Sequence, residues 1–227
     1  MINKLIKGDG NRISRIHDCR GNIVPMKIIF TNLPRAIYSW VLFRIFGMAL
    51  NRPWISYEAT KKIEEKLKKK ECDVLEFGSG ASTVWFATRS RHLTSIENDK
   101  KWHEIVSQRL KKIHLNLLNV DYYFSNNRVE YSGFKSDSNS QFDIILIDGP
   151  YREECLIKHL QSIKPGGLIY IDNTDVETSC GEVGEMARAL LELKTFAQER
   201  NAKITRFTDF APSCLHATEG YLVELPE

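Results

Sequence analysis

The stretch CDVLEFGSGAST, residues 72–83, constrains the fold of this chain more than any other part of the sequence. Residues 74–77 are mostly apolar and predict a short buried strand. Gly78 and Gly80 follow at once, and glycines allow a tight turn and a close approach between the backbone and a ligand. A helix is expected at residues 84–90. A strand, a glycine turn and a helix N-terminus together form a cradle of the kind that binds nucleotides.

Acidic and hydroxyl side chains surround this turn. Ser82 or Thr83 is expected to cap the helix that follows. Glu76 lies at the carboxyl end of the strand, where a carboxylate repels phosphate but attracts a cation or a pair of hydroxyls. A second predicted strand, residues 92–97, ends in Glu97 about 20 residues after the turn, which is the spacing of an acid that binds a ribose diol.

Strand and helix patterns alternate along most of the chain, which predicts an α/β fold with a doubly wound sheet. Residues 142–148 are the strongest strand, because their nearly continuous apolar run suits a strand buried on both faces. Residues 128–141 are polar and predict an irregular surface segment, and residues 164–167 predict a turn. The other expected strands are residues 119–124, 168–171, 203–210 and 220–225, and the other expected helices are 36–49, 56–70, 99–114, 151–163 and 183–197.

Four motifs resemble those of class I S-adenosylmethionine (SAM)-dependent methyltransferases. LEFGSGAST and SIEND resemble the first two motifs, and FDIILIDGPYR and KPGGLIYIDN resemble those of the fourth and fifth strands. The resemblance covers residues 54–225 and implies a seven-stranded, mostly parallel sheet with the last strand inserted antiparallel. RPWISYEA, SIENDKKW and IDGPYR are most similar to a poorly characterised group of bacterial small-molecule-type methyltransferases.

The resemblance also implies how SAM is held. Glu97 would accept hydrogen bonds from both ribose hydroxyls, Gly78 and Gly80 would let the backbone approach the methionine part, and Glu76 would help to hold the methionine amino group. The implied cofactor-binding residues are Glu76, Gly78, Ser79, Gly80, Ser82, Thr83, Glu97, Asn98 and Asp148.

Three oxygen-bearing side chains are expected on the acceptor side. Asp148 ends one predicted strand and Asp172 and Asn173 end the next, so all three face one crevice. They suit Mg²⁺ and resemble the metal triad of catechol-type O-methyltransferases. The alternative is that Asp148 only positions substrate while Asp172 and Asn173 cap a turn. Arg152, Tyr151 and Trp54 are expected to line the acceptor pocket. Arg152 is expected to hold an anionic acceptor, so Asp148 and Arg152 are the candidate catalytic residues.

Residues 1–50 are expected to form a helical extension, and residues 51–227 the methyltransferase domain. The apolar helix at 36–49 is too short to span a bilayer; packing on the domain or on a partner subunit is favoured over contact with a membrane surface. A net charge of +3 gives no reason to expect nucleic acid as a partner. The five cysteines are scattered, which favours a reducing, cytoplasmic compartment, and a homodimer is left open.

The function that this pattern predicts is SAM-dependent methylation of a small molecule at an oxygen nucleophile, with Mg²⁺ assistance as an option. An NAD-dependent Rossmann oxidoreductase is one alternative, which Glu76 and the missing third glycine disfavour. A non-catalytic SAM-binding protein is the other, and the sequence leaves it open. The methyl acceptor itself is not identified by any motif.

Overall fold

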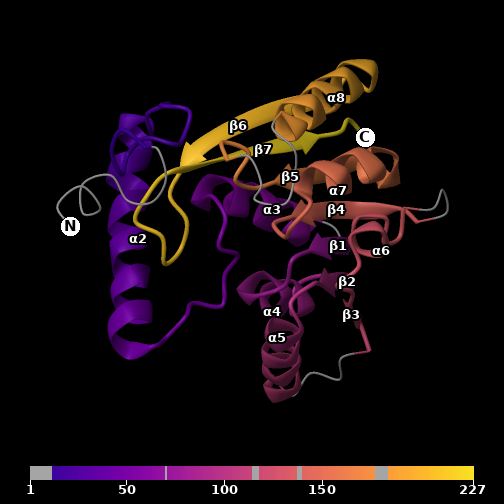
Figure 1. Cartoon of the computed structure of the whole chain (residues 1–227), viewed down its shortest axis with the longest axis horizontal. Coiled ribbons are helices and arrows are strands. Elements are labelled where there is room, and N and C mark those ends of the chain that lie inside the picture. The colour runs from indigo at the N-terminus through magenta and orange to yellow at the C-terminus, as the bar shows by residue number, and fades with distance from the viewer. Residues whose placement is uncertain (1–11, 70, 114–117, 137–139, 177–183) are drawn as a thin grey trace.

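A single seven-stranded sheet forms the centre of this computed structural model, which describes residues 12–227 except 70, 114–117, 137–139 and 177–183 (Figure 1). The strand order is β3-β2-β1-β4-β5-β7-β6. All neighbours from β3 to β5 pair in parallel, whereas β7 pairs antiparallel with both β5 and β6. The strands are β1 (Asp73–Phe77), β2 (His92–Glu97), β3 (Val120–Phe124), β4 (Phe142–Ile147), β5 (Ile163–Ile171), β6 (Lys203–Asp209) and β7 (Thr218–Glu224). The predicted α/β fold class is confirmed, including the antiparallel insertion.

Helices cover both faces of this sheet. Alternate residues of β1 and β4 point to opposite faces, so Leu75 and Ile145 belong to one apolar cluster and Val74 and Ile144 to the other. Helices α7 and α8 contribute to the first cluster, and α3, α4 and α5 to the second. The helices are α2 (Met26–Phe46), α3 (Tyr57–Lys69), α4 (Ala81–Ala87), α5 (Lys100–Lys112), α6 (Arg128–Ser132), α7 (Arg152–His159) and α8 (Glu185–Glu199).

Two predictions about local structure are wrong. The segment 128–141, expected to be irregular, begins with α6, in which Asn127 accepts a hydrogen bond from Glu130 N and Tyr131 is fully buried. The apparent turn at 164–167 lies inside β5, and the register between β4 and β5 shifts at this point. In both places a few buried contacts override a polar or glycine-rich local sequence.

Helix α2 begins ten residues before the expected start, and Pro34 lies inside it rather than at its beginning. Pro34 is on the exposed side, where the carbonyl that loses its amide partner can be hydrated. Only Asn32, Ala36 and Ser39 of this helix are buried. The face against the domain is nevertheless partly apolar, because half-buried Ile28, Ile29 and Leu33 pack with Ala36 on a cluster that includes Tyr57 and Phe210. Several larger apolar side chains of α2 remain exposed.

A buried carboxylate joins α2 to the sheet. Asp209, at the end of β6, accepts hydrogen bonds from Asn32 of α2, from the Ser56 hydroxyl and from Glu58 N of α3. Ser56 also accepts a hydrogen bond from Ala59 N, as predicted for a helix cap. Within the part of the chain that the structure describes, no helix combines the length and apolar character that a membrane span requires.

Candidate functional site

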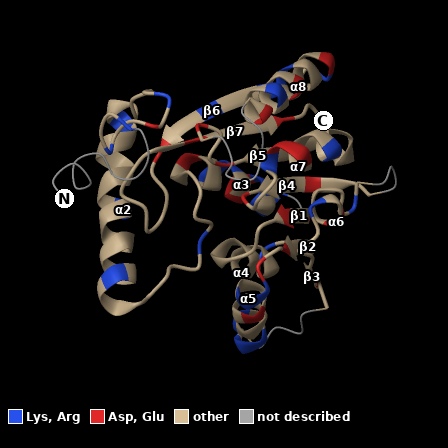
Figure 2. Cartoon of the chain, in the orientation of Figure 1, with Lys and Arg blue, Asp and Glu red and all other residues tan. Residues whose placement is uncertain are grey.

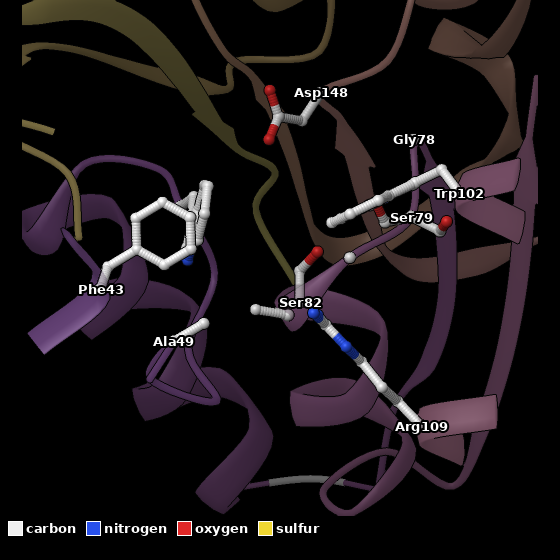
Figure 3. A pocket seen from close by; sticks show the side chains of 11 residues that line it. Phe43, Ala49, Gly78, Ser79, Ser82, Trp102, Arg109 and Asp148 are labelled. Atoms are coloured by element: carbon white, nitrogen blue, oxygen red, sulfur yellow. The ribbon is translucent and has the colours of Figure 1, made fainter. Parts of the chain in front are cut away.

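A cavity of about 210 Å³ lies at the carboxyl ends of β1 and β4, where ligands bind in open parallel sheets. Figure 3 shows side chains from the glycine turn, from α5 and from the end of α2 around the same space. The lining residues are Phe43, Ala49, Trp54, Gly78, Ser79, Gly80, Ala81, Ser82, Trp102, Arg109 and Asp148. Six of the residues predicted from sequence thus meet in one cavity: Trp54, Gly78, Ser79, Gly80, Ser82 and Asp148.

The two glycines of the turn have different structural roles. Gly78 has a φ of 87°, and a Cβ there would lie 2.6 Å from the Cα of Gly149. A glycine is therefore required at this position for the end of β1 to pack against the loop after β4. Gly80 has an extended φ, and the nearest atom to its Cβ would be Cζ2 of Trp102 at 3.9 Å. The fold therefore tolerates a side chain at Gly80, and that side chain would enter the cavity.

Helix α4 begins at Ala81, three residues before the predicted start, with Gly80 preceding it. Thr83 is not at the cap position itself; its hydroxyl reaches back and accepts a hydrogen bond from Gly80 N at 2.8 Å. The same hydroxyl donates to Oε2 of Glu76 at 2.6 Å. Thr83 therefore ties the glycine turn to the strand before it, and it does not line the cavity.

Glu76 is completely buried beneath the turn. Its Oε2 accepts hydrogen bonds from Thr83 and from the hydroxyl of Ser95, whereas its Oε1 finds no hydrogen-bond partner among the described residues. Burial raises the pKa of Glu76 to about 7, against the opposing effect of the surrounding hydroxyls. A carboxylate with one unpaired buried oxygen can accept a ligand donor such as an ammonium group.

We expect Glu76→Gln to change how stability depends on pH. The folded-state pKa of Glu76 lies above its ordinary value, so the native state binds more protons than the unfolded state between the two values. The free energy of unfolding should therefore fall as pH rises from about 5 to 8, by on the order of 3 kcal/mol from this group. Denaturant unfolding of the ligand-free protein should show the wild type losing stability relative to Glu76→Gln over this range. Parallel pH curves for the two proteins would contradict the assignment.

Glu97 binds the glycine turn in this structure. Its Oε2 accepts hydrogen bonds from the amide and the hydroxyl of Ser79, at 2.9 and 2.7 Å. Its Oε1 accepts from the amides of Asn98 and Asp99. Glu97 and Asn98 thus adjoin the turn without lining the cavity, and a ligand hydroxyl would replace the Ser79 hydroxyl at the carboxylate.

The sequence did not indicate that side chains of α5 and α2 would line the cavity. Trp102 donates a hydrogen bond from Nε1 to the carbonyl of Ser79 at 2.6 Å, and the guanidinium of Arg109 lies 5.4 Å from the centre of the Trp102 ring. Their spacing of seven residues, two helical turns, was the available signal, but Trp102 also fits the apolar core pattern of its helix. Phe43 and Trp54 form the opposite wall, with ring centroids 5.3 Å apart.

Asp148 is the carboxylate that lines the cavity. Burial raises the pKa of Asp148 to about 6, although Arg152 opposes this from 3.5 Å, measured between Nη2 and Oδ1. Arg152 is not itself among the lining residues. Asp148 therefore presents a carboxylate to the cavity, and the cation of Arg152 lies beside it outside the lining.

Asp172 is buried beside this pair. Its Oδ1 accepts a hydrogen bond from the hydroxyl of Tyr170 at 2.8 Å. Burial, and then the charge of Asp148, raises the pKa of Asp172 well above its usual range. Asn173 follows in a left-handed conformation, with a φ of 51°. Across the described ranges, no group of three His, Cys, Asp or Glu residues is arranged to hold a metal ion, so this set supplies two carboxylates and one amide.

Comparison with solved structures supports the fold. The O-methyltransferase TomG from Streptomyces achromogenes, solved in complex with SAM, is 15% identical, with a TM-score of 0.56 over 85% of this chain and 90% of that chain. Cofactor-bound Rv0187 from MTB is 16% identical, with a TM-score of 0.56 over 86% of this chain and 89% of that chain. A comparison with curated proteins finds no match.

Comparison with family models identifies the family. Residues 59–199, more than half of the chain, match the family described as Conserved hypothetical protein 95, a family of SAM-dependent methyltransferases. The match spans the glycine turn, β2 and the strand end that carries Asp148. The chain belongs to this family and is a SAM-dependent methyltransferase.

Proposed function

We propose that this methyltransferase methylates an oxygen nucleophile of a small molecule, with Asp148 on the acceptor side of the cavity. The observation that carries this proposal is that the carboxylate of Asp148 faces the same cavity as the glycine turn. SAM supplies an electrophilic methyl group on its sulfonium, so the protein mainly aligns donor and acceptor. No nucleic acid is part of this proposal.

The cofactor would lie along the glycine turn. Gly80 leaves room for the backbone to approach the ligand, and Ser79 and Ser82 present polar atoms on the cavity wall. Glu97 would accept hydrogen bonds from the ribose hydroxyls after releasing the Ser79 hydroxyl. Glu76 would pair its unpartnered oxygen with the methionine ammonium group, directly or through water.

The acceptor would lie between Asp148 and the aromatic wall. Phe43 and Trp54 offer an edge-to-face pair, which suits a planar or apolar acceptor. A carboxylate with a pKa of about 6 is ionised at neutral pH and is basic enough to take a proton from an acceptor hydroxyl during methyl transfer. Arg152 would hold Asp148 in its ionised form.

A divalent cation fits the donor types present at this position. Asp148, Asp172 and Asn173 would hold it, and two carboxylates with an amide oxygen are ligands that Mg²⁺ accepts together with water. The mutual repulsion between the two carboxylates supports the proposal, because a cation removes it. When bound, such a cation lowers the pKa of a coordinated hydroxyl.

The direct test is a screen of small hydroxylated and amine compounds with SAM that carries a labelled methyl group. The proposal predicts label in the methyl ether of a hydroxyl compound. Labelling only of amines would overturn the oxygen assignment. SAM binding without transfer to any acceptor would favour the alternative of a non-catalytic SAM-binding protein.

Glu97→Ala is expected to weaken SAM binding by on the order of 1–3 kcal/mol, because ribose hydroxyls would lose their acceptor. The substitution also removes the hydrogen bonds that hold Ser79, so thermal unfolding must be measured beside calorimetric SAM affinity. Asp99→Ala is the matched control, since it removes the cap of α5 but no proposed cofactor contact. Equal losses in the two variants would reject the ribose assignment.

A further inference from the structure

Helix α2 presents its large apolar side chains to solvent. Phe30, Tyr38 and Ile45 are 73%, 62% and 67% exposed, and Met26 and Ile37 are exposed beside them. These five residues, called the α2 face below, fall within roughly a third of the helix circumference at 100° per residue. Figure 1 shows α2 standing at one side of the molecule, with its C-terminal part extending away from the sheet. An ordinary surface helix carries polar residues on the side away from the core, whereas α2 carries large apolar side chains there as well.

The charged side chains of α2 and of its flanking segments in the sequence are all basic. No acidic residue occurs between Asp18 and Glu58, whereas Lys27, Arg35, Arg44 and Arg52 all lie in this interval. Figure 2 accordingly shows blue and no red on α2. The α2 face is therefore an apolar surface with cations at its borders and no acid of its own to pair with them.

Two of these cations share a hollow at the border of the face. Arg35 and Arg52 line a depression of about 420 Å³ together with Pro34, Tyr38, Leu50 and Tyr57. The guanidinium of Arg35 lies over the ring of Tyr57, 4.4 Å from its centroid, which holds it in place. A phosphate group is the natural occupant of a hollow with two guanidinium groups and no carboxylate.

We propose that α2 docks this protein on an anionic membrane surface. The helix would lie in the plane of the interface, with the α2 face among the upper acyl chains and with Arg35 and Arg52 on lipid phosphates. Charge complementarity favours this occupant over a second copy of the chain, because a symmetric contact between two α2 helices would bring these same cations together and α2 carries no acid to pair with them. A helix of this kind binds a membrane without spanning it.

Sedimentation with vesicles tests the proposal, using the full chain without SAM. Binding is expected to vesicles of phosphatidylcholine with phosphatidylserine, and much less to phosphatidylcholine alone. Arg35→Gln with Arg52→Gln should lower the partition coefficient about twenty-five-fold, since each basic residue contributes about fivefold near an anionic surface. Ile37→Ser with Ile45→Ser should lower it at least about tenfold through lost apolar burial.

Matched control variants separate membrane binding by α2 from the general effect of removing an exposed apolar side chain or an exposed cation. Leu191→Ser removes an equally exposed apolar side chain on α8, and Lys111→Gln removes an exposed cation on α5. Both should sediment like the wild type, and all variants should keep the wild-type melting temperature. Equal binding to neutral vesicles, or none to either kind, would overturn the proposal. A dimer in analytical ultracentrifugation that Ile37→Ser with Ile45→Ser dissociates, without vesicle binding, would assign the α2 face to a second copy instead.

Discussion

Gly80→Val is expected to abolish SAM binding while the protein still folds. The backbone at Gly80 is extended, and the nearest atom to a new Cβ is 3.9 Å away, so the turn accepts a Cβ without a clash. The valine methyl groups would instead occupy the space where the proposed cofactor meets the backbone. Calorimetry should show no heat of SAM binding, and thermal unfolding should remain cooperative with at most a small shift.

Gly78→Ala is the matched control for this prediction. Its Cβ would lie 2.6 Å from Gly149, and its φ of 87° is strained for any other residue, so the variant should lose on the order of 1–3 kcal/mol of stability. The two glycines would then separate a structural role from a binding role. A Gly80→Val protein that folds and binds SAM like the wild type would show that the cavity is not the cofactor site.

Much of the sheet could be predicted because its signals are local. Residues 142–148 form an apolar run that only a strand buried on both faces explains, and β4 is indeed fully buried. The two end strands were also predicted from their pattern, whereas the antiparallel insertion of the last strand was implied by the resemblance to methyltransferases. Helix α6 was missed because its stability comes from Tyr131, which packs against Phe77 from a distant part of the chain. Contacts of this kind leave no periodic pattern in a five-residue helix.

The site residues could be predicted only where they belong to a local sequence motif. Glycine turn residues and Asp148 could be named because they follow strands directly, and parallel strand ends gather at one edge. The position of Phe43 beside Trp54 could not be predicted, because it depends on how α2 packs on the sheet through Asp209. Nor could the two glycines be distinguished, since the contact of Gly78 with Gly149 is tertiary.

Asp148→Asn is expected to lower turnover by about 10²- to 10⁴-fold, the usual contribution of a positioned general base. Asparagine keeps the shape of the side chain, and the amide of residue 148 still donates to the carbonyl of Phe77, so the strand end should not move. Steady-state kinetics with the acceptor found in the screen should show the loss in kcat, while SAM affinity changes by less than about tenfold. Asp121→Asn is the control, because Asp121 is an exposed aspartate on β3, away from the cavity.

The same assay decides whether Asp148 works with a cation. Asp172→Asn keeps Asp148 as a base but removes one of the two carboxylates that would hold Mg²⁺. If a cation is needed, a chelator should abolish activity, Mg²⁺ should restore it, and Asp172→Asn should require more Mg²⁺ than the wild type. Full wild-type activity in the chelator would discard the cation and leave Asp148 as a base held by Arg152. Unchanged turnover in Asp148→Asn would reject both the role of a general base and the role of a cation ligand, because both require the negative charge of this carboxylate. Among the described residues, Asp148 is the one acidic side chain that lines the cavity.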